Sequence, residues 1–112
     1  MNTNIKNLPA DHTYFTEIGY SQSYPWVEVK RTAKTVTLAK VDVKPDPEWV
    51  AKKQFLPGGF CGHCPNQHEQ TWLFGMVNDA DTRVIRMTKK GWSHGGTRFV
   101  EDRATEFYDY NF

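Results

Sequence analysis

The sequence predicts an all-β protein: a single small domain built on a strongly bent antiparallel sheet or a partly open, SH3-like barrel with long loops. Three observations support this. Several segments alternate apolar and polar residues with the period of two that a half-buried strand requires. The chain of 112 residues is the length of one domain, and its 4 Trp, 5 Tyr and 7 Phe are enough to fill one core. No long stretch shows the 3.6-residue period of an amphipathic helix.

The first third of the chain is predicted to supply two strands. Residues 1–11 are polar and are expected to form a flexible N-terminal arm, which leaves residues 12–112 as the folded domain. Residues 12–18 are rich in β-forming side chains and end at Gly19, so they are predicted to form the first strand. Residues 24–31 place alternate valines on one face and are predicted to form the second.

A third strand is predicted at residues 34–43, but its apolar pattern is broken. The apolar residues lie on one face as far as Leu38 and on the opposite face from Val41 onwards. A β-bulge moves the following side chains to the other face of a sheet, so we predict a bulge or bend near Ala39 and Lys40.

The second half of the chain is predicted to continue the sheet. Residues 49–56 follow two prolines and are interpreted as a strand, with two helical turns as the alternative. Residues 69–74 and 83–88 are predicted to form a hairpin around an Asn-Asp-Ala-Asp turn at 78–81. The last strands, docked on the rest of the sheet, are predicted at residues 98–101 and 107–112.

Positive charge is concentrated in one stretch. The formal net charge of +1 argues against a protein that binds nucleic acid by charge alone. After Asp81, however, several cations follow without a carboxylate, which indicates either a basic face or the solvated sides of strands. A basic face suits phosphate binding, with Trp92 or another exposed aromatic side chain for base stacking. The candidate nucleic-acid-binding residues are Arg83, Arg86, Lys89, Lys90, Trp92 and Arg98.

The central loop, residues 56–72, holds both cysteines. Cys61 and Cys64 have the spacing of a zinc knuckle, and His68 follows closely, with His63 or His94 as a fourth ligand. This is half of a zinc motif, because a second ligand pair at defined spacing is missing. The candidate metal ligands are Cys61, Cys64, His68 and His94.

The interpretation adopted here is a structural loop without a cofactor, and zinc remains the alternative. In this interpretation the small cysteines pack inward, and Asn66, Gln67 and Gln70 bond backbone groups that the loop leaves unpaired.

Catalysis is not expected. Cys61-Gly62-His63-Cys64 matches the active-site tetrad of protein disulfide isomerases, but no amphipathic helix follows to stabilise a thiolate. The sequence thus argues against thiol chemistry at Cys61 and Cys64, which is kept only as an alternative. A Cys64 nucleophile with His12, His68 or His94 as its base is also conceivable, but sequence does not place these side chains within reach of one another.

The cellular setting is expected to be the cytosol. The first nine residues lack the apolar run of a signal peptide, and no window is long enough to cross a membrane. Two cysteines in a reducing compartment are expected to be thiols or metal ligands rather than a structural disulfide.

Three segments carry a resemblance. They are the central Gly58–Trp72 stretch (GGFCGHCPNQHEQTW), the Val-Glu-Val and Lys-Thr-Val-Thr-Leu segments before it, and the Phe-Tyr-Asp-Tyr-Asn-Phe end. From about Gly19 to Phe112 the chain resembles a group of small uncharacterised proteins encoded by bacteriophages, prophages and other mobile elements. The resemblance implies a bacterial cytosolic setting and a role in the contest between mobile element and host, such as binding and blocking a host or defence protein. It transfers no functional residue.

These observations lead to three functional hypotheses. The first is a non-catalytic binding protein that contacts, and so blocks, a host or defence protein. The second is a small β-barrel that binds nucleic acid, and the third is a zinc-stabilised structural module. The sequence leaves the partner, the oligomeric state and the strand order open.

Overall fold

The computed structural model describes residues 2–53, 64 and 66–109, and it confirms the all-β prediction. The strands are β1 (Asn2–Thr3), β2 (Ile5–Lys6), β3 (Tyr14–Ile18), β4 (Ser23–Arg31), β5 (Thr35–Pro45), β6 (Trp72–Thr88), β7 (Gly91–His94), β8 (Thr97–Glu101) and β9 (Arg103–Ala104). The helices are α1 (Pro47–Lys52) and the 3-10 helix η1 (Gln67–Glu69). No helix in the described part of the chain is long and apolar enough to cross a membrane.

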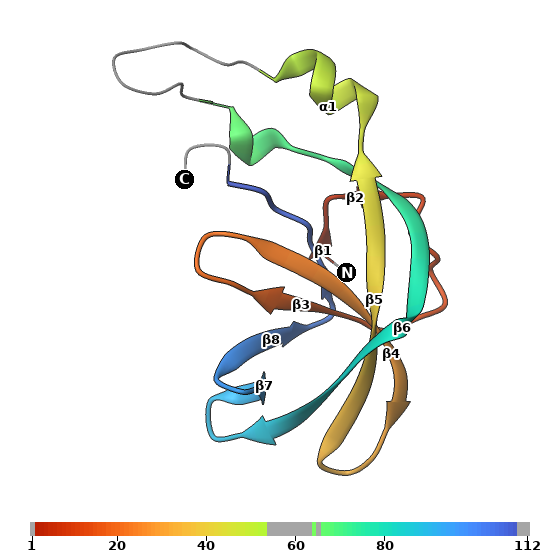
Figure 1. The fold of residues 1–112 in the computed structure, drawn as a ribbon, viewed down its shortest axis with the longest axis vertical. Coiled ribbons are helices and arrows are strands. Elements are labelled where there is room, and N and C mark those ends of the chain that lie inside the picture. Colours follow the sequence, from red (N-terminus) through yellow and green to blue (C-terminus); the bar gives the residue numbers. More distant parts are fainter. Residues whose placement is uncertain (1, 54–63, 65, 110–112) are drawn as a thin grey trace.

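The strands curl into a closed ring. Their order is β6-β5-β4-β3-β8-β7, and β7 pairs again with β6, so the bent sheet closes on itself. All pairs within the ring are antiparallel, whereas β2 joins β6 and β1 joins β9 in parallel. Beyond the ring, β5 and the first half of β6 extend together to α1, which gives a long molecule of 51 × 29 × 24 Å (Figure 1).

The strands β3, β4 and β5 bury side chains on both of their faces, which explains why neighbouring residues on one strand are buried together. Phe15 and Trp26 point into the ring, whereas their neighbours Tyr14 and Val27 point out of it. The interior cluster receives a side chain from every ring strand. Its members are Phe15, Trp26, Val36, Leu38, Ile85, Trp92 and Phe99.

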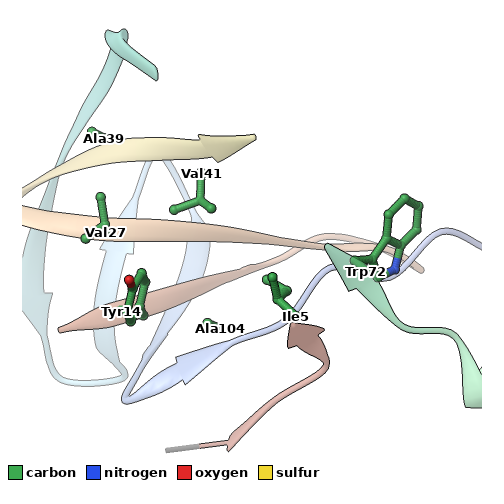
Figure 2. Packing of buried hydrophobic residues seen from close by; sticks show 7 residues of the cluster. All are labelled: Ile5, Tyr14, Val27, Ala39, Val41, Trp72 and Ala104. Carbon is green, nitrogen blue, oxygen red and sulfur yellow. The ribbon is translucent and has the colours of Figure 1, made fainter. Parts of the chain in front are cut away.

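A second cluster covers the outer face of the ring (Figure 2). It joins side chains of β3, β4 and β5 to residues from both ends of the chain and from the start of β6. Its members are Ile5, Tyr14, Val27, Ala39, Val41, Trp72 and Ala104. The N-terminal and C-terminal segments therefore cover the outer face of the sheet.

The irregularity predicted near Ala39 and Lys40 is present, but its extra residues lie on β6. The register between β5 and β6 shifts between Ala39 and Lys40, where residues 79–81 of β6 have no opposite residue on β5. The strand β5 itself alternates regularly, so Leu38 packs in the ring interior and Val41 packs in the outer cluster. The apolar residues change face because β5 is buried on both faces, and no bulge in β5 is needed.

The predicted hairpin at residues 69–88 is wrong. Residues 72–88 form one strand, β6, which pairs along its length with β5. The Asn-Asp-Ala-Asp segment bulges out between Asn78, opposite Lys40, and Thr82, opposite Ala39. Asn78 Oδ1 accepts the Ala80 N–H at 3.1 Å, so the turn-forming side chain acts locally without reversing the chain.

The strand predicted at residues 49–56 is also wrong where the structure describes it, because residues 47–52 form α1. Asp46 caps this helix by accepting the Glu48 N–H at 3.1 Å, and Pro47 occupies the first turn. An Asp-Pro pair is a helix-start signal that outweighs the β-forming side chains. Trp49 is buried, as expected of a core residue.

The flexible arm predicted at residues 1–11 is not observed for the residues described. Ile5 is buried in the outer cluster, and the Tyr14 hydroxyl donates to the Pro9 carbonyl at 2.6 Å. A polar composition gave no sign of this docking, because polar side chains such as Asn4 and Lys6 make many of the contacts alongside Ile5. The predicted docking of the C-terminal end is confirmed as far as Asp109, through a bridge between Ser23 and Phe107. Residues 110–112 lie outside the described part.

Candidate functional site

Three ring strands carry a row of polar side chains on their outer surface. Arg86 on β6 lies opposite Ser93 on β7, which lies opposite Arg98 on β8. Residues directly opposite one another share a face of a sheet. Because Ile85, Trp92 and Phe99 point inward, the row faces out. With Lys89 and Lys90 in the β6–β7 turn, Arg86 and Arg98 form what we call the basic face.

The cations of the basic face are not neutralised. Arg86, Lys89, Lys90 and Arg98 form no ion pair with any described residue. By contrast, Arg31 on β4 contacts Glu28 at 2.7 Å and Glu101 at 2.8 Å. Cations without a carboxylate partner remain available to an anionic ligand.

A pocket of about 240 Å³ opens at one side of the basic face. Lys90 and Arg98 line it together with Ser93, and Thr88 and Gly96 complete the wall. The lining residues that the structure describes include no carboxylate. The pocket is therefore lined by two residues with cationic side chains and two with hydroxyl groups.

Two of the predicted nucleic-acid-binding residues lie elsewhere. Trp92 is only 8% exposed and belongs to the ring interior, so it does not offer the exposed ring expected of a stacking residue. Its Nε1–H donates to Glu101 Oε1 at 3.2 Å. Arg83 lies 5.0 Å from the centre of the Trp26 ring and 3.9 Å from Glu17 Oε2, so its charge is compensated locally.

The structure also adds residues that the sequence did not single out. The carbonyl of Lys34, in the β4–β5 turn, accepts the Met87 N–H at 3.1 Å, which brings this exposed lysine beside the basic face. Ser93 and Gly96 line the pocket. Lys34 could have been found only by pairing the 24–43 hairpin with the 83–88 strand, which the sequence does not specify.

The candidate metal ligands do not converge in the described structure. Cys61 and His63 lie outside the described residues. Cys64 is buried, with Sγ 3.6 Å from Asn66 Oδ1, and His68 is exposed on η1. His94 ends β7, and Figure 1 shows β7 at the opposite end of the molecule from α1 and η1. In residues 2–53, 64 and 66–109, no three His, Cys, Asp or Glu side chains are grouped to hold a metal.

The histidines proposed as partners of a Cys64 nucleophile are dispersed in the same way. His94 Nδ1 lies 2.9 Å from the Val84 carbonyl oxygen. His12 is exposed and meets the edge of Tyr14, with ring centres 6.3 Å apart. Neither residue is placed beside Cys64.

The polar side chains around the central loop have the structural role expected of them. Gln70 is 2% exposed and its amide is fully used. Nε2 donates to the carbonyls of Gln67 and Tyr108, each at 2.9 Å, and Oε1 accepts from Trp72 Nε1 and the Tyr108 N–H. Asn66 Nδ2 donates to the Lys52 carbonyl at 2.8 Å, which ties the end of the loop to α1.

A coupled pair of charges lies on the β5 side of the molecule. Burial raises the pKa of the Glu106 carboxyl to about 7, against the opposing effect of the Lys40 charge. Burial also lowers the pKa of the Lys40 ammonium, which donates to the Val41 carbonyl at 2.8 Å. Lys40 also lies 5.8 Å from the Tyr24 ring centre. These contacts hold Lys40 within the fold. Because burial shifts the pKa values of both groups from their ordinary values, the free energy of unfolding depends on pH.

Comparison of the chain with protein-family models, with curated proteins and with solved structures finds no match in any of the three.

Proposed function

We propose that this protein binds nucleic acid through its phosphates, using the basic face. The observation that carries the proposal is the row Arg86–Ser93–Arg98, whose two arginines lie on β6 and β8, on either side of β7, with no carboxylate partner among the described residues. Arginine recognises phosphate oxygens through paired N–H groups, and lysine adds charge without fixed geometry. Lys89 and Lys90 extend the row at the β6–β7 turn.

The buried position of Trp92 determines the kind of binding expected. Without this ring as a stacking platform, affinity comes from phosphate contacts, which carry little sequence information. Binding should therefore be sequence-independent and strongly salt-dependent. Four phosphate contacts predict a slope of about −3 for log K against log salt concentration on a single strand.

Fluorescence anisotropy with a 3′-labelled single-stranded oligonucleotide tests this proposal. We expect binding at low salt that weakens as salt rises. Each of Arg86→Gln, Lys89→Gln, Lys90→Gln and Arg98→Gln should weaken binding and reduce the magnitude of the slope by about 0.7. Lys52→Gln, an exposed cation on α1 at the other end of the molecule, is the control and should change neither. No binding at low salt, or binding that ignores salt, would refute the proposal.

A second candidate function is docking of the host or defence protein that the resemblance implies, in the bacterial cytosol. It is favoured by one edge of β6, which pairs with β2 only at residues 72–73 and with β7 only at 86–88. Between these points the edge carries Met76, 57% exposed, and Val84, 42% exposed. An open strand edge with apolar side chains can accept a strand from a partner.

Affinity capture from bacterial lysate tests this second function. Val84→Lys and Met76→Lys should each abolish the recovery of a stoichiometric partner protein. Val29→Lys, at an exposed valine on β4, is the matched control and should leave recovery unchanged. Equal recovery with all three variants would exclude the β6 edge as the docking surface.

A further inference from the structure

We infer that the pocket between the β6–β7 turn and β8 is a subsite for a phosphomonoester, the doubly charged phosphate at the 5′ end of a nucleic acid or on a free nucleotide. This inference deepens the proposed function and rests on it for the nucleic-acid source. It concerns the pocket lined by Thr88, Lys90, Ser93, Gly96 and Arg98, which occupies only one side of the basic face.

The first argument is the donor set. Lys90 and Arg98 supply two positive charges, and neither forms an ion pair or a side-chain hydrogen bond with a described residue. The Ser93 hydroxyl likewise makes no hydrogen bond with a described atom. A phosphomonoester carries between one and a half and two negative charges near pH 7, whereas an internucleotide phosphate carries one. Two cationic residues lining one pocket therefore match a terminal phosphate better than an internal one.

The second argument is how the pocket is held open. Thr88 Oγ1 donates to the Gly91 carbonyl at 2.8 Å and accepts the Lys90 N–H at 3.2 Å. Thr88 therefore positions the turn that carries Lys90, and its hydroxyl is already used. Gly96, which also lines the pocket, has φ +85°, a left-handed conformation that glycine adopts without strain in the turn between β7 and β8.

The third argument is size. Pockets that enclose drug-sized ligands begin at roughly 300 Å³, and this pocket measures about 240 Å³. It suits one phosphate and the sugar attached to it rather than a longer segment. Arg86 and Lys89 carry the remaining charge of the basic face and do not line the pocket. They are placed to contact the phosphates that follow.

The basic face provides a matched experiment, because pocket and non-pocket cations occur in pairs. Lys90 and Lys89 share one turn, and Arg98 and Arg86 flank Ser93 in one row. Affinity is measured for two 3′-labelled oligonucleotides of one sequence, with a 5′ phosphate or a 5′ hydroxyl. The unmodified protein should prefer the 5′ phosphate by about tenfold, the effect of one or two extra charge-assisted hydrogen bonds.

The variants separate the pocket from general electrostatics. Lys90→Gln and Arg98→Gln should remove the preference for the 5′ phosphate, and Ser93→Ala should reduce it. Lys89→Gln and Arg86→Gln remove the same charges but should keep the preference while weakening both complexes equally. Equal affinity of the unmodified protein for the two oligonucleotides would overturn the inference and leave the proposed function standing.

Failure of the proposed function is recognised separately. If neither oligonucleotide binds, the proposed nucleic-acid binding is refuted. The pocket is then tested with inorganic phosphate and adenosine monophosphate by NMR. Amide shifts confined to residues 88–98, lost in Arg98→Gln but kept in Arg86→Gln, would support a free-nucleotide site. No shift with either probe would overturn the inference. If the oligonucleotide binds, tighter binding of it than of adenosine monophosphate assigns the subsite to nucleic-acid ends.

Discussion

The side chain of Asn4 forms two hydrogen bonds with the main chain of Glu106, although 102 positions separate the two residues. The Asn4 side chain donates Nδ2–H to the Glu106 carbonyl at 2.8 Å, and Oδ1 accepts the Glu106 N–H at 3.1 Å. Nδ2 also donates to the Gln70 carbonyl at 3.2 Å. One side chain thus joins both ends of the chain to the segment that precedes β6.

The first prediction concerns this contact. Asn4→Ala should lower the free energy of unfolding by about 3 kcal/mol, because three hydrogen bonds are lost and main-chain groups are left partly buried without partners. Urea denaturation followed by tryptophan fluorescence measures the change. Asn2→Ala, at an exposed residue of β1, should stay within about 0.5 kcal/mol of the unmodified protein. Equal effects of the two substitutions would contradict the role of Asn4.

Gln70 provides the second prediction. Gln70→Ala should cost about 2–4 kcal/mol, because Trp72 Nε1 and the Tyr108 N–H lose their acceptor in a buried site. Gln70→Glu should be more damaging at neutral pH than at pH 4. An ionised carboxylate cannot donate to the carbonyls of Gln67 and Tyr108, whereas the protonated form keeps one donor. Glu69→Ala, at an exposed neighbour, serves as the control for denaturation at both pH values.

The third prediction concerns acid stability at the start of α1. Hydrogen bonds from Lys6 and Thr71, each at 2.7 Å, hold the pKa of Asp46 at about 2. Because this pKa lies below the value in the unfolded chain, the ionised carboxylate stabilises the fold above about pH 4. This contribution is lost as pH falls towards 2. Asp46→Asn should flatten that part of a stability curve measured between pH 2 and 5, whereas Glu48→Gln should leave it unchanged.

Glu106 produces the opposite dependence, and this is the fourth prediction. Burial raises its pKa from 4.5 to about 7, so the folded protein binds a proton more tightly than the unfolded chain. Stability from this group is complete below about pH 4.5 and is lost as pH rises to 7. Glu106→Gln should remove this decline from the unfolding free energy.

Lys40→Met provides a second test of the same pair. The Lys40 charge lowers the pKa of Glu106, so its removal should extend the decline in stability above pH 7. A decline that stayed in place in both variants would exclude Glu106 as its source.

The fifth prediction distinguishes core packing from ligand binding at Trp92. Trp92→Ala should cost about 3–5 kcal/mol, as expected for a large side chain removed from a packed interior. Trp92→Phe keeps most of the packing against Phe15 but loses the bond from Nε1 to Glu101, and should cost less. Its affinity for an oligonucleotide should equal that of the unmodified protein. A stable Trp92→Phe protein with impaired binding would show that the ring contacts the ligand.

Local patterns in the sequence were sufficient to predict several features of the fold. The apolar pattern of residues 34–43 predicted an irregularity near Ala39 and Lys40, where the register between β5 and β6 shifts. The change of apolar face between Leu38 and Val41 has another cause, because side-chain direction alternates along a strand and β5 is buried on both faces. The strand at 83–88 was also predicted, since it lies within β6, and it carries Arg86 of the basic face. The Asp-Pro pair before α1 was a local signal too, but β-forming side chains after it were given more weight.

Other features depend on contacts between distant parts of the chain. Sequence gives Arg83 and Arg86 the same chemistry, yet pairing with β5 turns Arg83 towards Trp26 while Arg86 faces outward beside Ser93. Trp92 is buried because β7 closes the ring against β6. The direction of a side chain depends on strand register, and register across a closed ring is set by all its pairings together. For this reason composition and spacing indicated a β-protein with one cation-rich stretch, and long-range pairing placed Lys90 and Arg98 at the pocket.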